Sequence, residues 1–196
     1  MALLQIKKRL MALAGMVLSV YLLLHMLSNL SFISPQAFND FYAFYNQPLI
    51  RWPLWILVSA ALLLHVIVAI QIRLHNAKAR PVAYEHRQHH WIPAWLVSTV
   101  ITLILLFIVW HMAQMWSFDG DDIYRQTQAL FESGWQLVIY LAGLGLMALH
   151  LWHSLPNVLQ TMGKTSKQYL WLSTALVAIL TIGFALVPVL AYWSAQ

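Results

Sequence analysis

Five long runs of apolar residues, separated by short polar segments, dominate the chain. They cover residues 10–32, 53–72, 93–116, 134–159 and 169–192. Each run is close to the ~20 residues that a helix needs to cross the ~30 Å hydrocarbon core of a bilayer. The pattern predicts an all-α membrane protein with five transmembrane helices, in which residues 1–196 form a single domain.

The segments between the apolar runs are polar or aromatic, and we expect them to be loops. Residues 38–45 are rich in Phe and Tyr, residues 75–90 are polar, and residues 119–132 are acidic. These segments are too short to form a separate soluble domain. The sequence therefore predicts that any chemistry takes place within the membrane helices or at their ends.

The distribution of Lys and Arg predicts the direction of the helices. With the N-terminus in the cytoplasm, the outer side carries only Arg51 and Arg125. The inner side then carries Lys7, Lys8, Arg9, Arg73, Lys78, Arg80, Arg87, Lys164 and Lys167. Because positively charged short loops remain in the cytoplasm, we expect the N-terminus inside and the C-terminus outside.

Composition narrows the chemistry further. The chain is 61% hydrophobic and 9% charged, whereas a typical soluble domain is about 25% charged. It contains no cysteine, which excludes disulfides, iron–sulfur ligation, thiolate catalysis and the covalent attachment of c-type haem. Any haem in this protein would be bound without a covalent link.

Four histidines lie deep inside four different apolar runs: His25, His65, His111 and His150. An unsatisfied polar group in an apolar medium costs roughly 2–7 kcal/mol, so these side chains need partners. A single intramembrane His often donates a hydrogen bond to another helix or belongs to a proton path. For four such residues we favour iron, because neutral imidazole is a common metal ligand and an axial ligand of haem.

The depths of these histidines predict how they pair. His25 and His111 lie about 8 and 6 residues from the outer ends of their helices, or ~12 and ~9 Å. His65 and His150 lie about 8 and 10 residues from the inner ends, or ~12 and ~15 Å. The sequence therefore predicts an outer pair, His25–His111, and an inner pair, His65–His150. Each pair would hold one haem within a four-helix bundle, with the fifth helix at its periphery.

Two kinds of neighbouring residue offer alternatives to these ligands. His153 lies one turn from His150 and competes with it as a ligand, or meets a haem propionate or a quinone. Thioether ligands are available in principle from Met26, Met112 and Met147, although packing is the ordinary role of Met in a core.

Short motifs along nearly the whole chain resemble one known family. They are Lys8–Gly15, His25–Leu30, Phe38–Phe41, Arg73–Pro81, His150–Ser154 and Gln160–Gly163. In this order and spacing they resemble the di-haem cytochrome b membrane-anchor subunit of succinate:quinone oxidoreductase and quinol:fumarate reductase, respiratory complex II. In the family's H-L-x-H-G pattern the first His is the axial ligand, which favours His150 over His153.

The resemblance implies a function in respiratory electron transfer. The family's anchor passes electrons through two b haems, between an iron–sulfur subunit and membrane quinone (menaquinone or ubiquinone). A flavoprotein subunit, also on the cytoplasmic face, handles succinate and fumarate. The resemblance thus implies a bacterial-type cytoplasmic membrane as the location, with lipid around the chain and no nucleic-acid partner. The chain itself would bind no dicarboxylate.

We place the quinone near the inner haem, close to Arg73, His153 and Asn157. Here the chain departs from the family pattern, with Ser154 in place of a Gly, and Pro156 and Asn157 in place of a Trp and a Ser.

Two other functions remain open from the sequence. The chain could be the cytochrome b anchor of a nitrate reductase, formate dehydrogenase or hydrogenase, which also pair histidines across helices. It could instead be a haem-free transporter or proton channel that uses His relays. The apolar runs lack a broken central helix and an intramembrane carboxylate, which argues against transport.

Overall fold

The computed structural model describes residues 2–78, 94–118, 120 and 122–196, and all of its regular elements are helices. The helices are α1 (Ala2–Asn29), a short 3-10 helix η1 (Leu30–Ile33), α2 (Pro35–Tyr45), α3 (Pro48–Lys78), α4 (Ala94–Trp116), α5 (Ile123–Glu132), α6 (Gly134–Thr161) and α7 (Lys167–Ser194). Arg80, Pro81 and Arg87, named above, lie outside the described residues, as does most of the predicted polar loop 75–90.

Within the described residues, five helices are long and apolar enough to cross a membrane: α1, α3, α4, α6 and α7. Their outer faces carry large apolar side chains, such as Leu106, 61% exposed, and Ile182, 64% exposed. A face of this kind is stable in lipid and costly in water. Each of the five predicted spans therefore falls in a helix that is long and apolar enough to cross a membrane, which indicates a multi-pass membrane protein.

The helices extend beyond the apolar runs that predicted them. Helix α1 begins at Ala2, eight residues before the predicted span, and includes the basic residues Lys7 and Arg9. Helix α3 continues from Ile72 to Lys78. Hydropathy marks the stretch that contacts the hydrocarbon core, whereas backbone hydrogen bonding continues into the interfacial region. The sequence pattern therefore located the helices but not their ends.

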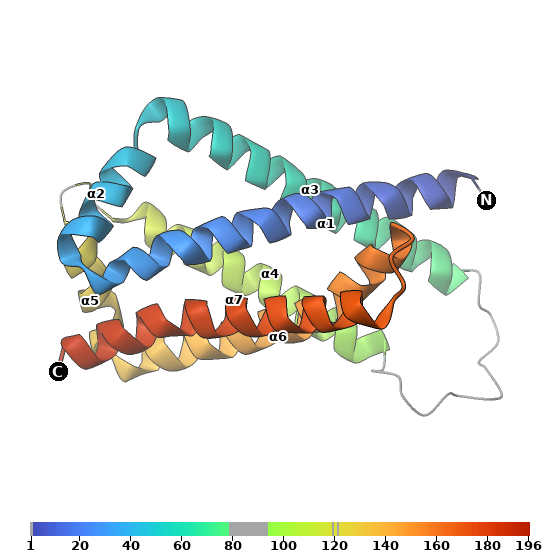
Figure 1. The fold of residues 1–196 in the computed structure, drawn as a ribbon. Helices are drawn as coiled ribbons and strands as arrows, with labels where there is room; N and C mark the ends of the chain where they lie inside the picture. Colours follow the sequence, from blue (N-terminus) through green and yellow to red (C-terminus); the bar gives the residue numbers. More distant parts are fainter. Residues whose placement is uncertain (1, 79–93, 119, 121) are drawn as a thin grey trace.

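The two ends of the bundle differ in charge (Figure 1). The N-terminus, the end of α3, the start of α4 and the α6–α7 turn lie at one end, with α2, α5 and the C-terminus at the other. The first end carries Lys7, Lys8, Arg9, Arg73, Lys78, Lys164 and Lys167. The second end carries Arg51 and Arg125, so we refer to the first as the inner end and the second as the outer end.

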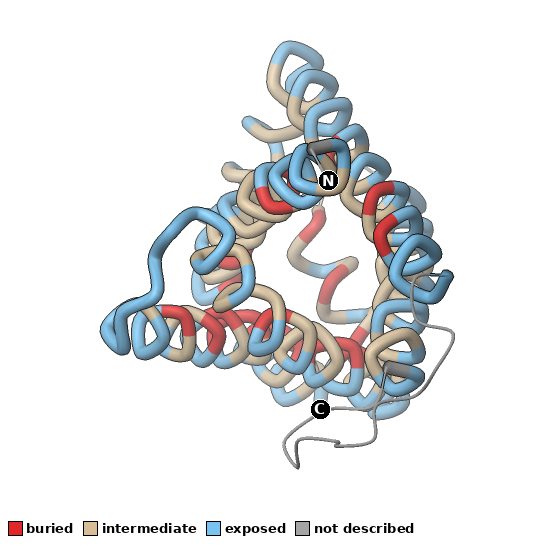
Figure 2. Tube along the Cα trace, turned by 90° about the vertical axis from the view of Figure 1, so that its right-hand side faces the viewer, coloured by how far each residue is buried: buried red, intermediate tan, exposed pale blue. Residues whose placement is uncertain are grey.

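The helices whose histidines pair are not the helices that pack most closely. Helix α1 packs along α3, α6 and α7, and α4 packs along α6. Within the described residues, neither α1 with α4 nor α3 with α6 forms an extended backbone interface. In the view along the bundle, the helices surround a common axis (Figure 2). The two pairs of helices that carry paired histidines thus face one another without close backbone packing.

Helix α7, predicted to be peripheral, packs along α6, α5 and α1, and among the described residues it is the most buried of the five long helices. Its inward face contains Val177, Leu180 and Phe184, all buried, and its outward face contains exposed Ile179 and Ile182. Gly183 permits a close approach to α1, because an added Cβ would overlap the thioether of Met26.

The aromatic segment predicted as a loop is instead helix α2. Ser34 caps it, accepting a hydrogen bond from the backbone N–H of Ala37 at 3.4 Å, and Pro35 begins its first turn. Phe38, Tyr42 and Tyr45 recur at helical spacing on one face. The prediction of a loop was wrong, because it considered how many aromatic residues the segment contains and not their helical spacing.

The acidic segment predicted as a loop also contains a helix, α5. The carboxylate of Asp122 caps it by accepting from the backbone N–H of Arg125 at 3.1 Å. Ile123, Thr127 and Phe131 form its buried face, at a spacing of four residues. Together α2 and α5 form an outer cap over the bundle, with Phe38 and Phe131 in one apolar cluster beneath it.

Asn39 joins the two helices of the outer cap. Its amide Nδ2 donates to Asp122 Oδ1 at 3.0 Å, and its Oδ1 accepts from the backbone N–H of Tyr124 at 2.9 Å. The bonds from Arg125 N–H and from Asn39 lower the pKa of Asp122. Because folding lowers this pKa, the contribution is present at neutral pH and is lost as the pH falls below the ordinary carboxyl range.

Asn39→Ala should therefore loosen the outer cap, since two hydrogen bonds are lost and the backbone N–H of Tyr124 loses its acceptor. We expect faster hydrogen exchange at the Tyr124 amide, which measures this loosening of the outer cap. Asn46→Ala is the matched control, because Asn46 hydrogen-bonds Tyr42 through its backbone N–H. Equal exchange rates in the two variants would contradict this role of Asn39.

Candidate functional site

The four intramembrane histidines form two pairs across the bundle. The ring centroids of His25 on α1 and His111 on α4 are 6.2 Å apart, and the ring planes are inclined by 52°. The centroids of His65 on α3 and His150 on α6 are 6.3 Å apart, inclined by 87°. These are the two pairs expected from depth, and the structure brings each pair together from helices that do not pack extensively on one another.

The two pairs occupy different levels of the bundle. The imidazole of His65 lies beside Gly15 of α1, where an added Cβ would lie 3.4 Å from its Cε1. His25 lies about ten residues further along the same helix, which corresponds to ~15 Å along the axis. The pair His25–His111 thus forms an outer level and the pair His65–His150 an inner level.

The spacing within each pair suits a metal ion between the rings. A metal lies about 2.0–2.1 Å from a ligating imidazole nitrogen, so two imidazoles on opposite sides of one metal have centroids about 6 Å apart. Two imidazoles joined directly by a hydrogen bond of about 3 Å would have centroids only about 5 Å apart. The observed separations of 6.2 and 6.3 Å agree with the first arrangement.

The number of histidines at each level indicates which kind of metal group could bind there. Each level brings together two imidazoles, one from each of two helices. A structural zinc site uses four protein ligands and a catalytic one usually three. A pair of axial imidazoles instead fits a metal whose other four positions are filled by a macrocycle, as in a bis-histidine haem. The residues present therefore fit the group that the sequence predicted.

At the inner level, a backbone carbonyl orients His65. Its Nδ1 lies 3.3 Å from the carbonyl oxygen of Met11. A carbonyl only accepts hydrogen bonds, so Nδ1 must carry the proton. The lone pair is then on Nε2, which is the arrangement required of a neutral imidazole ligand.

At the outer level, side chains orient His111. Its Nδ1 lies 3.1 Å from the hydroxyl of Tyr140 on α6, and that hydroxyl donates to Gln114 Oε1 at 3.0 Å. The chain continues from Gln114 Nε2 to Gln136 Oε1 at 3.4 Å. Since the one hydroxyl proton of Tyr140 goes to Gln114, Nδ1 of His111 donates and its Nε2 keeps the lone pair.

His25 is held by aromatic rings on two sides. Tyr21, one turn earlier on α1, stacks on it with centroids 5.5 Å apart and planes 8° from parallel. Phe184 of α7 contacts it from the neighbouring helix, also with a centroid separation of 5.5 Å. Asn29, a candidate partner from its spacing of four residues, instead accepts a hydrogen bond from the Tyr42 hydroxyl at 3.1 Å.

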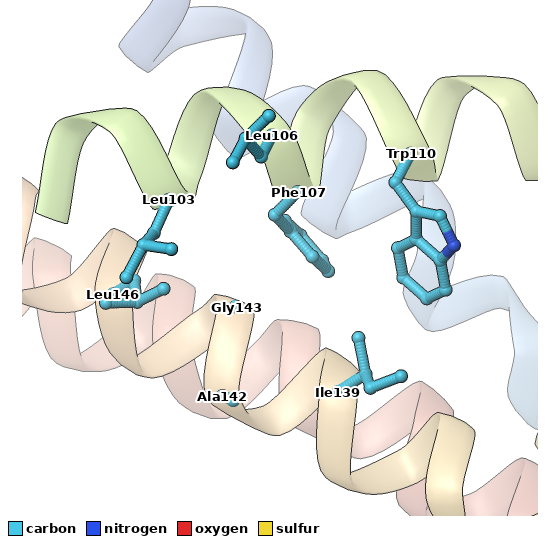
Figure 3. A pocket seen from close by; sticks show the side chains of 8 residues that line it. All are labelled: Leu103, Leu106, Phe107, Trp110, Ile139, Ala142, Gly143 and Leu146. Atoms are coloured by element: carbon cyan, nitrogen blue, oxygen red, sulfur yellow. The ribbon is translucent and has the colours of Figure 1, made fainter. Parts of the chain in front are cut away.

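Phe107 packs directly against His111, with planes 13° from parallel and centroids 6.1 Å apart. Its ring also faces Gly143 of α6, where an added Cβ would lie 2.6 Å from Cε2. Both residues line an apolar groove of about 390 Å³ between α4 and α6 (Figure 3). Gly143 therefore provides the space that lets Phe107 lie against the outer histidine level.

The residues predicted to contact quinone lie at or toward the inner end of the bundle. Arg73, His153 and Asn157 are all exposed. Asn157 donates from Nδ2 to the backbone carbonyl of His153 at 2.8 Å, a bond within α6. The structure thus places the three side chains at the surface, whereas His150 lies half-buried opposite His65.

Several residues that shape the site were not anticipated from the sequence: Met11, Tyr21, Gln114, Tyr140 and Phe184. Tyr21 was accessible from helical spacing alone, because it lies four residues before His25. Met11, Tyr140 and Phe184 contact the histidines from different helices, and Gln114 acts through Tyr140. Nothing in a single sequence gives the relative rotation of two helices.

The part of the chain that the structure describes is all-helical, has five helices suited to crossing a membrane, and brings four histidines together as two pairs at different levels. No family model, curated protein or solved structure matches the chain.

Proposed function

We propose that the chain is a membrane cytochrome b that holds two b-type haems. His25 and His111 would be the axial ligands of the outer haem, and His65 and His150 those of the inner one. The observation that carries the proposal is the separation of about 6 Å within each pair, combined with the orientation of His65 and His111. The four helices that carry the histidines, α1, α3, α4 and α6, would surround the haems, with α7 packed against α1 and α6.

Each bound haem would supply a one-electron iron couple. The chain's own residues have separate tasks. The backbone carbonyl of Met11 and the hydroxyl of Tyr140 keep one imidazole of each pair in the ligating tautomer. Phe107 and Phe184 exclude water beside the outer pair. Two levels ~15 Å apart suit the passage of electrons from one face of the membrane toward the other.

We propose further that the chain anchors a succinate:quinone oxidoreductase or quinol:fumarate reductase in a bacterial-type cytoplasmic membrane. The resemblance of its motifs to that family supports this assignment. The excess of basic residues at the inner end supports a cytoplasmic position for the iron–sulfur and flavoprotein partners. Arg73, His153 and Asn157 would lie near the quinone, menaquinone or ubiquinone.

Purification of the complex through a tag on this chain tests the assignment. We expect a flavoprotein carrying covalent flavin and an iron–sulfur protein to purify with it, and succinate to reduce its b-type absorbance. A partner containing molybdenum or nickel would instead indicate the anchor of a nitrate reductase, formate dehydrogenase or hydrogenase. Absence of any Soret band would overturn the cytochrome assignment and favour a haem-free His relay.

A further inference from the structure

We infer that Tyr140 is a positioning residue that holds the His111 imidazole as an electron-rich ligand and lowers the reduction potential of the outer haem alone. This inference rests on the proposed function and assigns a specific role to one side chain of the site. It starts from a difference between the two levels: a side-chain hydroxyl orients His111, whereas a backbone carbonyl orients His65.

The position of the Tyr140 hydroxyl is set by packing. Tyr140 is only 9% exposed. Its ring makes edge contacts with Phe107 and Phe131, at centroid separations of 5.5 and 4.7 Å, and lies 5.5 Å from Trp110. A ring held on these sides cannot swing away from His111 without disturbing three neighbours. Packing of the ring therefore holds the hydroxyl beside the imidazole Nδ1.

The hydrogen bonds of this hydroxyl have a fixed direction. Tyr140 donates its proton to Gln114 Oε1, and Gln114 donates in turn to Gln136. A hydroxyl that donates is a better acceptor, because hydrogen bonds in a chain polarise one another. This chain of hydrogen bonds thus draws the Nδ1 proton of His111 toward Tyr140 and increases the electron density of the His111 imidazole.

An electron-rich axial imidazole stabilises oxidised iron more than reduced iron, so it lowers the reduction potential. Removing the hydroxyl should reverse this effect at the outer level. The inner level should not respond, because the acceptor for His65 is the carbonyl of Met11. Substitution of Tyr140 therefore offers a means of shifting the reduction potential of one haem relative to that of the other.

Tyr140→Phe in the full complex tests the inference by potentiometric titration of the b-type absorbance. We expect two haems to remain bound and one midpoint potential to rise, while the other is unchanged. The component that moves should be the one that disappears in His25→Ala. Tyr192→Phe is the matched control, because Tyr192 contributes its ring to the same apolar cluster and packs against Gly134.

Gln114→Leu provides a second variant that leaves Tyr140 in place. It removes the acceptor of the Tyr140 proton, so we expect a smaller rise of the same potential. Unchanged potentials in both variants, or equal shifts of both haems, would overturn the inference while leaving the cytochrome assignment intact. Absence of haem from the unaltered protein would instead overturn the proposed function itself.

Discussion

His25→Ala is expected to reduce the haem content from about two to about one per chain, and His65→Ala to do the same for the other haem. Each substitution removes one of the two imidazoles that we propose hold a haem, from a pair whose ring centroids lie 6.2 or 6.3 Å apart. The remaining imidazole has no second protein ligand opposite it, and a non-covalent haem depends on both. Reduced minus oxidised spectra with a haem assay measure the loss.

A substitution pair on α6 provides the internal control. His150→Ala should lose the inner haem, whereas His153→Ala, one turn away and exposed, should retain both haems. Retention of both haems in His150→Ala, with loss in His153→Ala, would show that the inner ligand is the other histidine. Retention of both haems in all four variants would contradict the bis-histidine arrangement.

Gly143→Ala is expected to produce the second large effect, on the outer level. The added Cβ would lie 2.6–2.8 Å from three ring atoms of Phe107, which itself packs on His111. Either Phe107 must leave the histidine or α4 and α6 must separate. Overpacking of this kind typically costs about 1–3 kcal/mol. We expect lower thermal stability in detergent, with loss or spectral change of the outer haem only.

Gly145→Ala is the matched control, since it makes the same change two residues along the same helix. Its added Cβ would meet no atom within 4 Å. The substitution should be neutral or slightly stabilising, because Ala is the better helix former by about 1 kcal/mol. Equal stability and equal spectra for the two variants would contradict the role assigned to Gly143.

Much of the architecture could be read from hydropathy, because the bilayer imposes one requirement on every span. Backbone groups must be satisfied within the helix, and about 20 apolar residues must follow one another. That requirement predicted five spans and, through the depths of His25, His111, His65 and His150, the pairs that face each other. The depth of a residue along a helix can be counted directly in the sequence, because each residue adds ~1.5 Å along the helix axis.

The outer cap was missed because its helices are short and polar in part. The segments that became α2 and α5 lie outside the apolar runs, so hydropathy gave no reason to examine their period. Ser34 and Asp122 were nevertheless recognisable capping residues, followed by aromatic and apolar residues at helical spacing. A period-based reading of the interfacial segments would have found both helices.

The residues around the histidines depended on information that the sequence does not contain. Tyr140 reaches His111 from α6, and Phe184 reaches His25 from α7. Many small van der Waals contacts between helices in lipid determine which faces of two helices meet. The histidine pairs could be predicted from their depth, whereas the residues that orient them required the three-dimensional structure.

The haem content of the purified, unaltered protein tests the central claim most directly. Extraction of haem as its pyridine complex, quantified against the protein, identifies the b type and counts the groups. The two levels of histidine predict two haems b per chain, both lost only when both pairs are altered. A protein purified intact without haem would contradict the proposal that the histidine pairs hold haem. It would favour hydrogen bonding or proton transfer as the role of the four histidines.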